Sequence, residues 1–152
     1  YILQCLGATF IVYLVLTTIS VISSDLVIAS IASTAFVIFS APHAERARTR
    51  YVLGGYFVGF VVGAICYYLM KLCMLYFPSL HIHFDEIFGA LAIGFSIFIM
   101  VVLDLEHPPA CSAALALIIN DWNQWTIIIT YFALFILVIS RVVLRKKLIQ
   151  LM

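Results

Sequence analysis

The stretch DLEHPPACSAAL, residues 104–115, lies between two long apolar segments and holds two carboxylates, a histidine and a double proline. Pro109 suits the first position of a helix, because its missing N–H would have no partner there in any case. Pro108 disfavours a helical conformation at His107. We therefore predict that residues 104–107 are extended and that a helix begins at Pro109, directly after the imidazole.

The composition indicates a chain that folds in lipid. It has 152 residues, of which 66% are hydrophobic and 10% charged, and its mean hydropathy is +1.21. A soluble domain carries about a quarter charged residues, so this much apolar surface requires a bilayer as solvent. We predict one transmembrane domain over residues 1–152 and no nucleic-acid partner. Tyr1 is no natural start, so we expect a trimmed chain from which any targeting segment is missing.

Six hydrophobic segments predict an all-α bundle that crosses the membrane several times: residues 2–22, 26–41, 51–77, 87–103, 109–120 and 126–144. A helix needs about 20 apolar residues to cross the hydrocarbon core. The second and fifth segments are shorter. An extended 104–107 adds about 13 Å to a following helix of about 20 Å, which together span a core of about 30 Å.

The basic residues predict the topology. They gather in two groups, one between the second and third segments and one after the sixth: Arg46, Arg48 and Arg50, then Arg141, Arg145, Lys146 and Lys147. The positive-inside rule places both groups in the cytoplasm. If the second and fifth segments were both re-entrant, the two groups would lie on opposite sides of the membrane. If both segments cross, the two groups lie on the same side, together with the N-terminus.

The two short segments resemble each other. Residues 31–35, IASTA, align with residues 109–113, PACSA, and each stretch lies in the middle of a three-segment unit. An odd number of segments makes the second unit inverted. We predict inverted pseudo-repeats of about residues 1–77 and 87–147, in which the second and fifth segments are short or interrupted, as in transporters with a site at the membrane midplane.

A small anion is the ligand that this arrangement favours. A helix N-terminus carries about half a positive charge and unpaired N–H groups, and two such termini would face each other at residues 31–34 and 109–112. Hydroxyl groups and the imidazole would add donors. The predicted binding residues are Ser33, Thr34, His107, Pro108, Pro109, Ala110, Cys111 and Ser112.

Several motifs follow one another in a definite order: SIASTA at residues 30–35, Ala41-Pro42, Arg50 and Gly54-Gly55, and EHPPA at residues 106–110. This order resembles the HPP family of integral membrane proteins, some of which transport nitrite in plastids and cyanobacteria. The resemblance implies nitrite transport in a bacterial inner membrane or a plastid envelope. The chain differs at Ala32 and Cys111, where glycine is expected, and at Tyr56, where histidine is expected.

Two interpretations are open for Asp104 and Glu106. Two positions apart in an extended stretch, their side chains point to one side and His107 to the other. The pair is either a proton carrier with a raised carboxyl pKa or a pair of solvated groups at the cytoplasmic mouth. Arg50 is either a topology determinant or a residue that attracts anions to this mouth.

Gly55, Gly59 and Gly63 form a GxxxGxxxG row, which predicts close helix packing, either within the chain or in a homo-oligomer, which we expect. HIHFDE, residues 81–86, is interpreted as a solvated loop rather than a metal site. Trp122 and Trp125 suit the membrane interface. The cysteines are interpreted as small buried residues, with no disulfide or zinc site: Cys5, Cys66, Cys73 and Cys111.

Three functions are compatible with these features. The first is transport of a small inorganic anion, without catalysis or a cofactor. The second is an intramembrane enzyme that pairs His107 with Cys111 or Asp104. The third is a regulatory membrane subunit that transports nothing.

Overall fold

The computed structural model describes residues 2–19, 25–77, 83–120, 122–145 and 148. These residues form six α-helices and one short 3-10 helix, and no strand occurs among them. The elements are α1 (Ile2–Ile19), α2 (Asp25–Ser40), η1 (Glu45–Ala47), α3 (Thr49–Tyr76), α4 (Phe84–Val102), α5 (Pro109–Ile119) and α6 (Gln124–Leu144). The predicted all-helical bundle is confirmed.

Three described helices are long and apolar enough to cross a membrane, namely α3, α4 and α6. The outer surface of the bundle is apolar, with large exposed side chains such as Phe57, Phe98 and Phe132, which suits contact with lipid. Helices α2 and α5 are short, as predicted, with 16 and 11 residues. The α5 helix covers about 16 Å, and the extended residues before it add about 10 Å.

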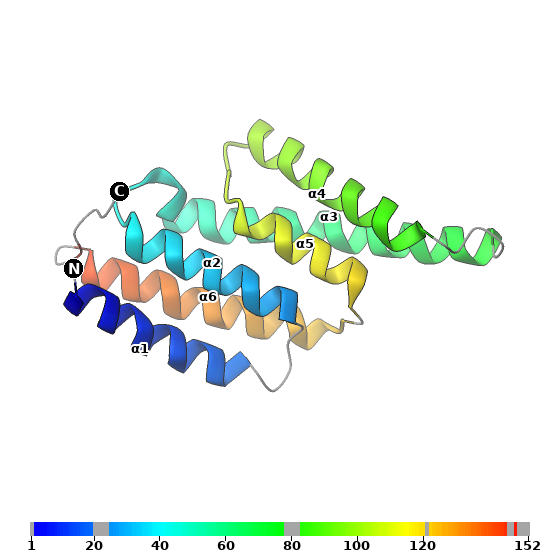
Figure 1. Cartoon of the computed structure of the whole chain (residues 1–152). Helices are drawn as coiled ribbons and strands as arrows, with labels where there is room; N and C mark the ends of the chain where they lie inside the picture. The colour runs from blue at the N-terminus through cyan, green and yellow to red at the C-terminus, as the bar shows by residue number, and fades with distance from the viewer. Residues whose placement is uncertain (1, 20–24, 78–82, 121, 146–147, 149–152) are drawn as a thin grey trace.

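Helix α5 lies at the centre of the bundle, in contact with α2, α3 and α4 (Figure 1). Its small side chains are fully buried, Ala110, Ala113 and Ala114 among them. Small residues allow helix backbones to approach closely, which is how membrane helices gain packing energy. A short central helix of this kind fixes the position of the residues that precede it.

The predicted glycine row lies on α3 against α5. A Cβ atom added at Gly59 would lie 2.5 Å from the carbonyl oxygen of Ala110, and one at Gly63 would lie 2.8 Å from that of Ala114. At Gly55 it would lie 2.6 Å from the Cβ atom of His107. The partner of the glycine row is therefore a helix of the same chain.

The described residues of the two basic groups lie at the same end of the bundle, while Lys146 and Lys147 lie outside the described residues. The Arg141 guanidinium donates through Nε and Nη2 to the carbonyl oxygen of Pro42, at 3.0 and 2.7 Å. This joins the end of α6 to the arginine loop, residues 41–48 between α2 and α3. The Gln4 side chain donates to the carbonyl oxygen of Phe39 at 2.6 Å, which brings the start of α1 to the same end (left in Figure 1). The side of the membrane on which this end lies stays a prediction.

The predicted interruption of the second segment is wrong. Helix α2 is continuous from Asp25 to Ser40, so residues 31–34 provide no helix N-terminus. Nothing in this segment breaks a helix, because it contains neither proline nor glycine. Its hydroxyl groups bond back to carbonyls of the same helix, Ser30 to Val27 and Thr34 to Ser30. The inverted pseudo-repeats of about 1–77 and 87–147 stay a prediction.

Candidate functional site

Four polar side chains meet where α2, α3 and the start of α5 pack together. They are Ser30, Thr34, Tyr56 and His107, each 0% exposed, and we call them the hydroxyl–imidazole cluster. The Thr34 hydroxyl lies 2.9 Å from the Tyr56 hydroxyl and 3.0 Å from His107 Nε2. The Tyr56 hydroxyl donates to Ser30 Oγ at 3.0 Å. The cluster contains hydrogen-bonding groups from three separate elements and no carboxylate.

The end of α4 sets the course of the chain toward His107. Asp104 adopts a left-handed conformation with a φ of 51°. The N–H of Leu105 bonds to the carbonyl of Met100 at 2.9 Å, and that of Asp104 to Val101 at 3.2 Å. These two bonds form a Schellman motif, in which the left-handed residue is usually glycine. The motif ends α4 and turns the chain back, so that residues 105–107 run extended to the start of α5.

His107 is held from both sides of its ring. Nδ1 lies 3.1 Å from the backbone carbonyl of Arg46, which only accepts hydrogen bonds. Nδ1 therefore carries a proton, and in the neutral imidazole Nε2 is then an acceptor. The Tyr56 ring packs beside it at 5.7 Å between centroids. The imidazole is fixed between the arginine loop and α2.

The hydroxyl–imidazole cluster has fewer donor protons than hydrogen-bonding contacts. Ser30 donates to the carbonyl of Val27, and Tyr56 donates to Ser30. Thr34 then has one proton for three neighbours, the Ser30 carbonyl, the Tyr56 hydroxyl and His107 Nε2. A proton on Nε2 would turn the last of these into a donor to Thr34. Burial of His107 opposes that proton, because a buried charge needs a partner.

The first amides of α5 are not free, contrary to expectation. The N–H of Ala110 bonds to the carbonyl of His107 at 2.9 Å, and that of Cys111 bonds to Pro108 at 3.1 Å. A tight first turn satisfies these donors within the chain. Since α2 is continuous as well, two facing helix termini do not form an anion site here. The donors that the structure gathers are side chains.

A pocket of about 330 Å³ lies beside the cluster, between α4 and the start of α5. Its walls are mostly apolar, with His107, Glu106 and Cys111 as polar or reactive members; the lining residues are Ile97, Met100, Val101, Glu106, His107, Pro108 and Cys111. The pocket is large enough to hold a small inorganic ion with water. Its lining includes the buried His107 and also Glu106, which lies 3.9 Å from Arg46 of the arginine loop.

Asp104 and Glu106 face basic residues at that end. Asp104 accepts from the Tyr51 hydroxyl at 3.1 Å and lies 3.7 Å from Arg50 Nη2. Glu106 lies 3.9 Å from Arg46 Nη2, and its side chain is 47% exposed. Because Asp104 is left-handed, the expected alternation along an extended stretch does not apply to it. Both carboxylates are paired and exposed, and neither belongs to the hydroxyl–imidazole cluster.

Comparison with known families agrees with the His-Pro-Pro segment at the centre of this site. The family model for the HPP transmembrane region matches residues 1–148. The chain belongs to the HPP family. A transmembrane protein of Dictyostelium discoideum is 29% identical over 101 residues, which is 66% of this chain and 33% of that protein. This HPP chain therefore spans about a third of the length of that relative. No solved structure matches this HPP chain.

The structure brings together only some of the predicted binding residues of this HPP protein. Thr34 and His107 belong to the cluster, and Pro109 and Ala110 are buried at the start of α5. Ser33 and Pro108 are exposed, and Cys111 and Ser112 are half-buried on α5. Ser33 therefore lies on a different face of α2 from Thr34.

The proposed enzyme pairs are not among the hydrogen bonds of the described residues. Both ring nitrogens of His107 have other partners, and Asp104 bonds to Tyr51 and lies beside Arg50. Cys111 is a free thiol on α5. No group of three or more possible metal ligands occurs among the residues that the structure describes.

The remaining predicted features lie away from the cluster. The predicted loop at residues 81–86 is wrong in its second half, because Phe84, Asp85 and Glu86 form the first turn of α4. His81 and Ile82 lie outside the described residues, and His83 Nδ1 lies 3.9 Å from Glu86. Trp122 packs against Tyr67 and Tyr68, while Trp125 is exposed. The four cysteines are free, but burial was wrongly expected for all of them: Cys66 is buried, Cys73 and Cys111 are half-buried, and Cys5 is exposed on α1.

Sequence reasoning missed Ser30 and Tyr56 as members of the site. Ser30 and Thr34 are four residues apart, so they share one face of α2. That spacing is visible in the sequence and favours Thr34 with Ser30 rather than with Ser33. Tyr56 follows Gly55 in an apolar span, at the position where the HPP resemblance leads us to expect histidine. A phenol in place of an imidazole keeps a hydrogen-bond donor next to His107.

Proposed function

We propose that this HPP protein transports a small inorganic anion across a membrane, with nitrite as the first candidate on the family resemblance. The observation that carries the proposal is the buried hydroxyl–imidazole cluster, with His107, Thr34 and Tyr56 in mutual contact inside an apolar bundle. Polar groups inside a membrane are costly and usually lie on a substrate or ion pathway.

The chemistry of the cluster favours an anion over a cation. No carboxylate contacts its side chains, and a proton on His107 Nε2 would supply a donor that the neutral network lacks. Nitrite offers only acceptor atoms to such a donor. A cation site would need carboxylate or carbonyl oxygens arranged around the ion.

The pocket beside His107 supplies an approach. It reaches from the imidazole toward Glu106 and the basic end of the bundle. Thr34 and Tyr56 close the other side of the imidazole. An anion in the pocket would replace the Thr34 contact at His107 Nε2. Transport then requires that the contact of Thr34 with His107 opens and closes again.

The additional proton at His107 suggests how anion and proton are coupled. An imidazolium buried alone in this site would be costly, because a buried charge needs a partner. A proton on Nε2 together with nitrite in the pocket gives a neutral pair, which is far less costly to bury. We therefore assign the proton-coupling role to His107, while Asp104 and Glu106 stay paired with arginines.

The test is nitrite uptake by liposomes that contain the purified protein, compared with empty liposomes. Uptake is expected to exceed that of the empty liposomes and to rise as the external solution is made mildly acid. A matched set with His107→Gln should take up nitrite at the rate of the empty liposomes. Equal uptake by wild-type and empty liposomes at every pH would overturn the proposal.

A further inference from the structure

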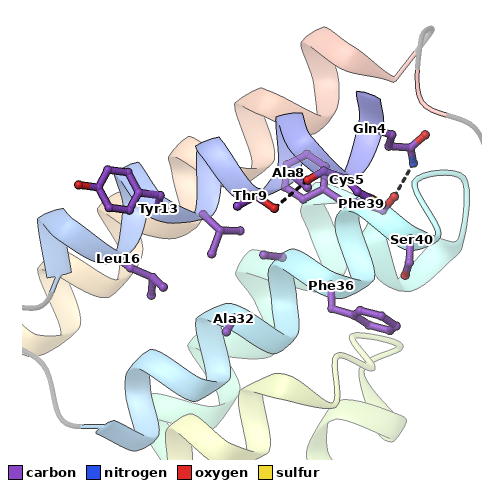
Figure 2. Close-up of a pocket in the computed structure, with 12 residues that line it drawn as sticks. Gln4, Cys5, Ala8, Thr9, Tyr13, Leu16, Ala32, Phe36, Phe39 and Ser40 are labelled. Carbon is purple, nitrogen blue, oxygen red and sulfur yellow. Dashed lines mark hydrogen bonds between the residues drawn. The ribbon is translucent and has the colours of Figure 1, made fainter. Parts of the chain in front are cut away.

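A second, larger groove lies between α1 and α2 (Figure 2), and no residue of the hydroxyl–imidazole cluster lines it. Its volume is about 530 Å³ and most of its lining is apolar, including Ala8, Val12, Ala32 and Phe36. It runs along α1 from Gln4 to Leu16, a distance of about 18 Å at the rise of an α-helix. That length is close to one leaflet, which is half of a hydrocarbon core of about 30 Å.

Two polar side chains of the groove, Gln4 and Ser40, lie at one end. Figure 2 shows Gln4, Phe39 and Ser40 there, with Tyr13 and Leu16 at the opposite end. Ser40 is 7% exposed, and its hydroxyl has no hydrogen-bond partner in the described part of the chain. A buried hydroxyl without a partner is costly, so this one is available to a ligand that brings an acceptor.

Unpaired positive charge lies at this same end. In the arginine loop and the first turn of α3, each arginine has a carboxylate within 4 Å: Arg46 has Glu106, Arg48 has Glu45 and Arg50 has Asp104. Arg141 and Arg145 have no carboxylate partner among the described residues. Arg141 holds the carbonyl of Pro42, two residues beyond Ser40. Arg145 follows one helical turn later.

We propose that this groove binds an anionic phospholipid, with one acyl chain between α1 and α2 and the phosphate beside Ser40 and Arg145. The apolar length of the groove fits a chain from the leaflet at the basic end. The exposed Arg145 complements the charge of the headgroup, and the Ser40 hydroxyl gains an acceptor. This inference is independent of the proposed transport function.

The test is native mass spectrometry of the detergent-purified protein with phosphatidylglycerol or phosphatidylcholine of identical acyl chains. We expect a one-lipid complex that favours phosphatidylglycerol by about fivefold or more, the gain typical of one basic residue near a lipid headgroup. The Arg145→Gln variant should lose this preference. Lys71→Gln, which removes an exposed positive charge from another part of the bundle, should keep it.

A pair of matched variants locates the acyl chain. Ala32 and Ala29 are both exposed on α2, but only Ala32 lines the groove. Ala32→Phe should abolish the one-lipid complex and Ala29→Phe should not. Equal loss in both variants, or equal binding of both lipids to the wild type, would overturn the proposal. So would a groove filled by a second copy, seen as a dimer that Ala32→Phe dissociates, or binding of inorganic phosphate alone that equals the binding of the lipid.

Discussion

His107 is the residue on which the proposed transport chemistry depends, and its two ring nitrogens have different tasks. Nδ1 is bound to a backbone carbonyl of the arginine loop, whereas Nε2 faces the Thr34 hydroxyl at 3.0 Å. Only Nε2 is in a position to exchange a partner without disturbing the backbone. This asymmetry makes the imidazole both a fixed structural element and a group that can change its protonation.

The first prediction concerns His107→Gln and pH. A glutamine amide can still bond to Thr34, but it does not titrate. Nitrite uptake by wild-type liposomes should increase as the external solution is made more acid, because protonation at Nε2 favours the anion. The variant should show low uptake without this pH dependence. An unchanged pH profile in the variant would exclude His107 as the proton carrier.

The second prediction concerns the Tyr56 hydroxyl. Tyr56→Phe removes the donor to Ser30 and a contact of Thr34, so the protein should lose about 1 kcal/mol of stability and most of its nitrite uptake. Ser33→Ala is the control, because Ser33 is exposed on α2. Thermal unfolding in detergent and liposome uptake measure the two effects. Wild-type uptake in Tyr56→Phe would remove this hydroxyl from the site.

A member of the hydroxyl–imidazole cluster could be predicted from the sequence only where the features of its own segment determine its position. His107 was predicted because it directly precedes the double proline, whereas Thr34 was predicted through a helix terminus at residues 31–34 that does not form. Tyr56 was missed, since its meeting with Thr34 depends on how α2 packs against α3. No spacing within one segment encodes that contact.

Small residues on both helices allow α5 to pack closely against α3 at the centre of the bundle. Gly55, Gly59 and Gly63 face the backbone of the His-Pro-Pro segment and α5. At Gly59 and Gly63 the nearest atom is a backbone carbonyl oxygen, which does not move aside as a side chain does. The register of α5 along α3 therefore fixes the position of His107.

The third prediction compares two glycines. A Cβ at Gly59 would meet the Ala110 carbonyl at 2.5 Å, whereas one at Gly94 on α4 has nothing within 4 Å. Gly59→Ala should therefore lower stability by about 1–3 kcal/mol, the usual cost of overpacking. Gly94→Ala should leave the unfolding temperature unchanged or raise it slightly. Equal unfolding temperatures for the two variants would mean that α3 and α5 are not packed as described.

The helix boundaries were predicted correctly where proline restricts the backbone. They were predicted wrongly where a boundary was inferred only from the likeness of one segment to another. Pro108 and Pro109 predicted both the extended approach and the start of α5 at Pro109. The left-handed Asp104 was not foreseen, because a Schellman motif usually carries glycine at that position. The break in α2 was inferred only from its likeness to the fifth segment, and the residues of α2 contain nothing that breaks a helix.

At the scale of the whole molecule, the arginine loop and the end of α6 lie together, as the distribution of basic residues predicted. The contact of Arg141 with Pro42 joins two segments 99 residues apart in sequence. Charge distribution predicts which ends share a side, because basic groups all favour the same face of the membrane. It does not predict which helices touch within the bundle.

The fourth prediction is the topology. In a variant without native cysteines, single cysteines at Glu45 and Arg145 should react with a membrane-impermeant maleimide from the same side of the membrane. A cysteine at Glu86, in the first turn of α4, should react only from the opposite side. Labelling of intact and opened spheroplasts distinguishes the sides, and we expect Glu45 and Arg145 on the cytoplasmic one. Reaction of those two positions from opposite sides would contradict the six-crossing arrangement.

The central claim is that a small anion and a proton meet at His107. The most direct measurement is the magnetic resonance shift of isotope-labelled imidazole nitrogens in the membrane-embedded protein, with His107→Gln used to assign the signal. Addition of nitrite at mildly acid pH should convert Nε2 of His107 from an acceptor to a protonated nitrogen. A His107 signal that saturating nitrite leaves unchanged, while the same sample still transports nitrite, would contradict this account.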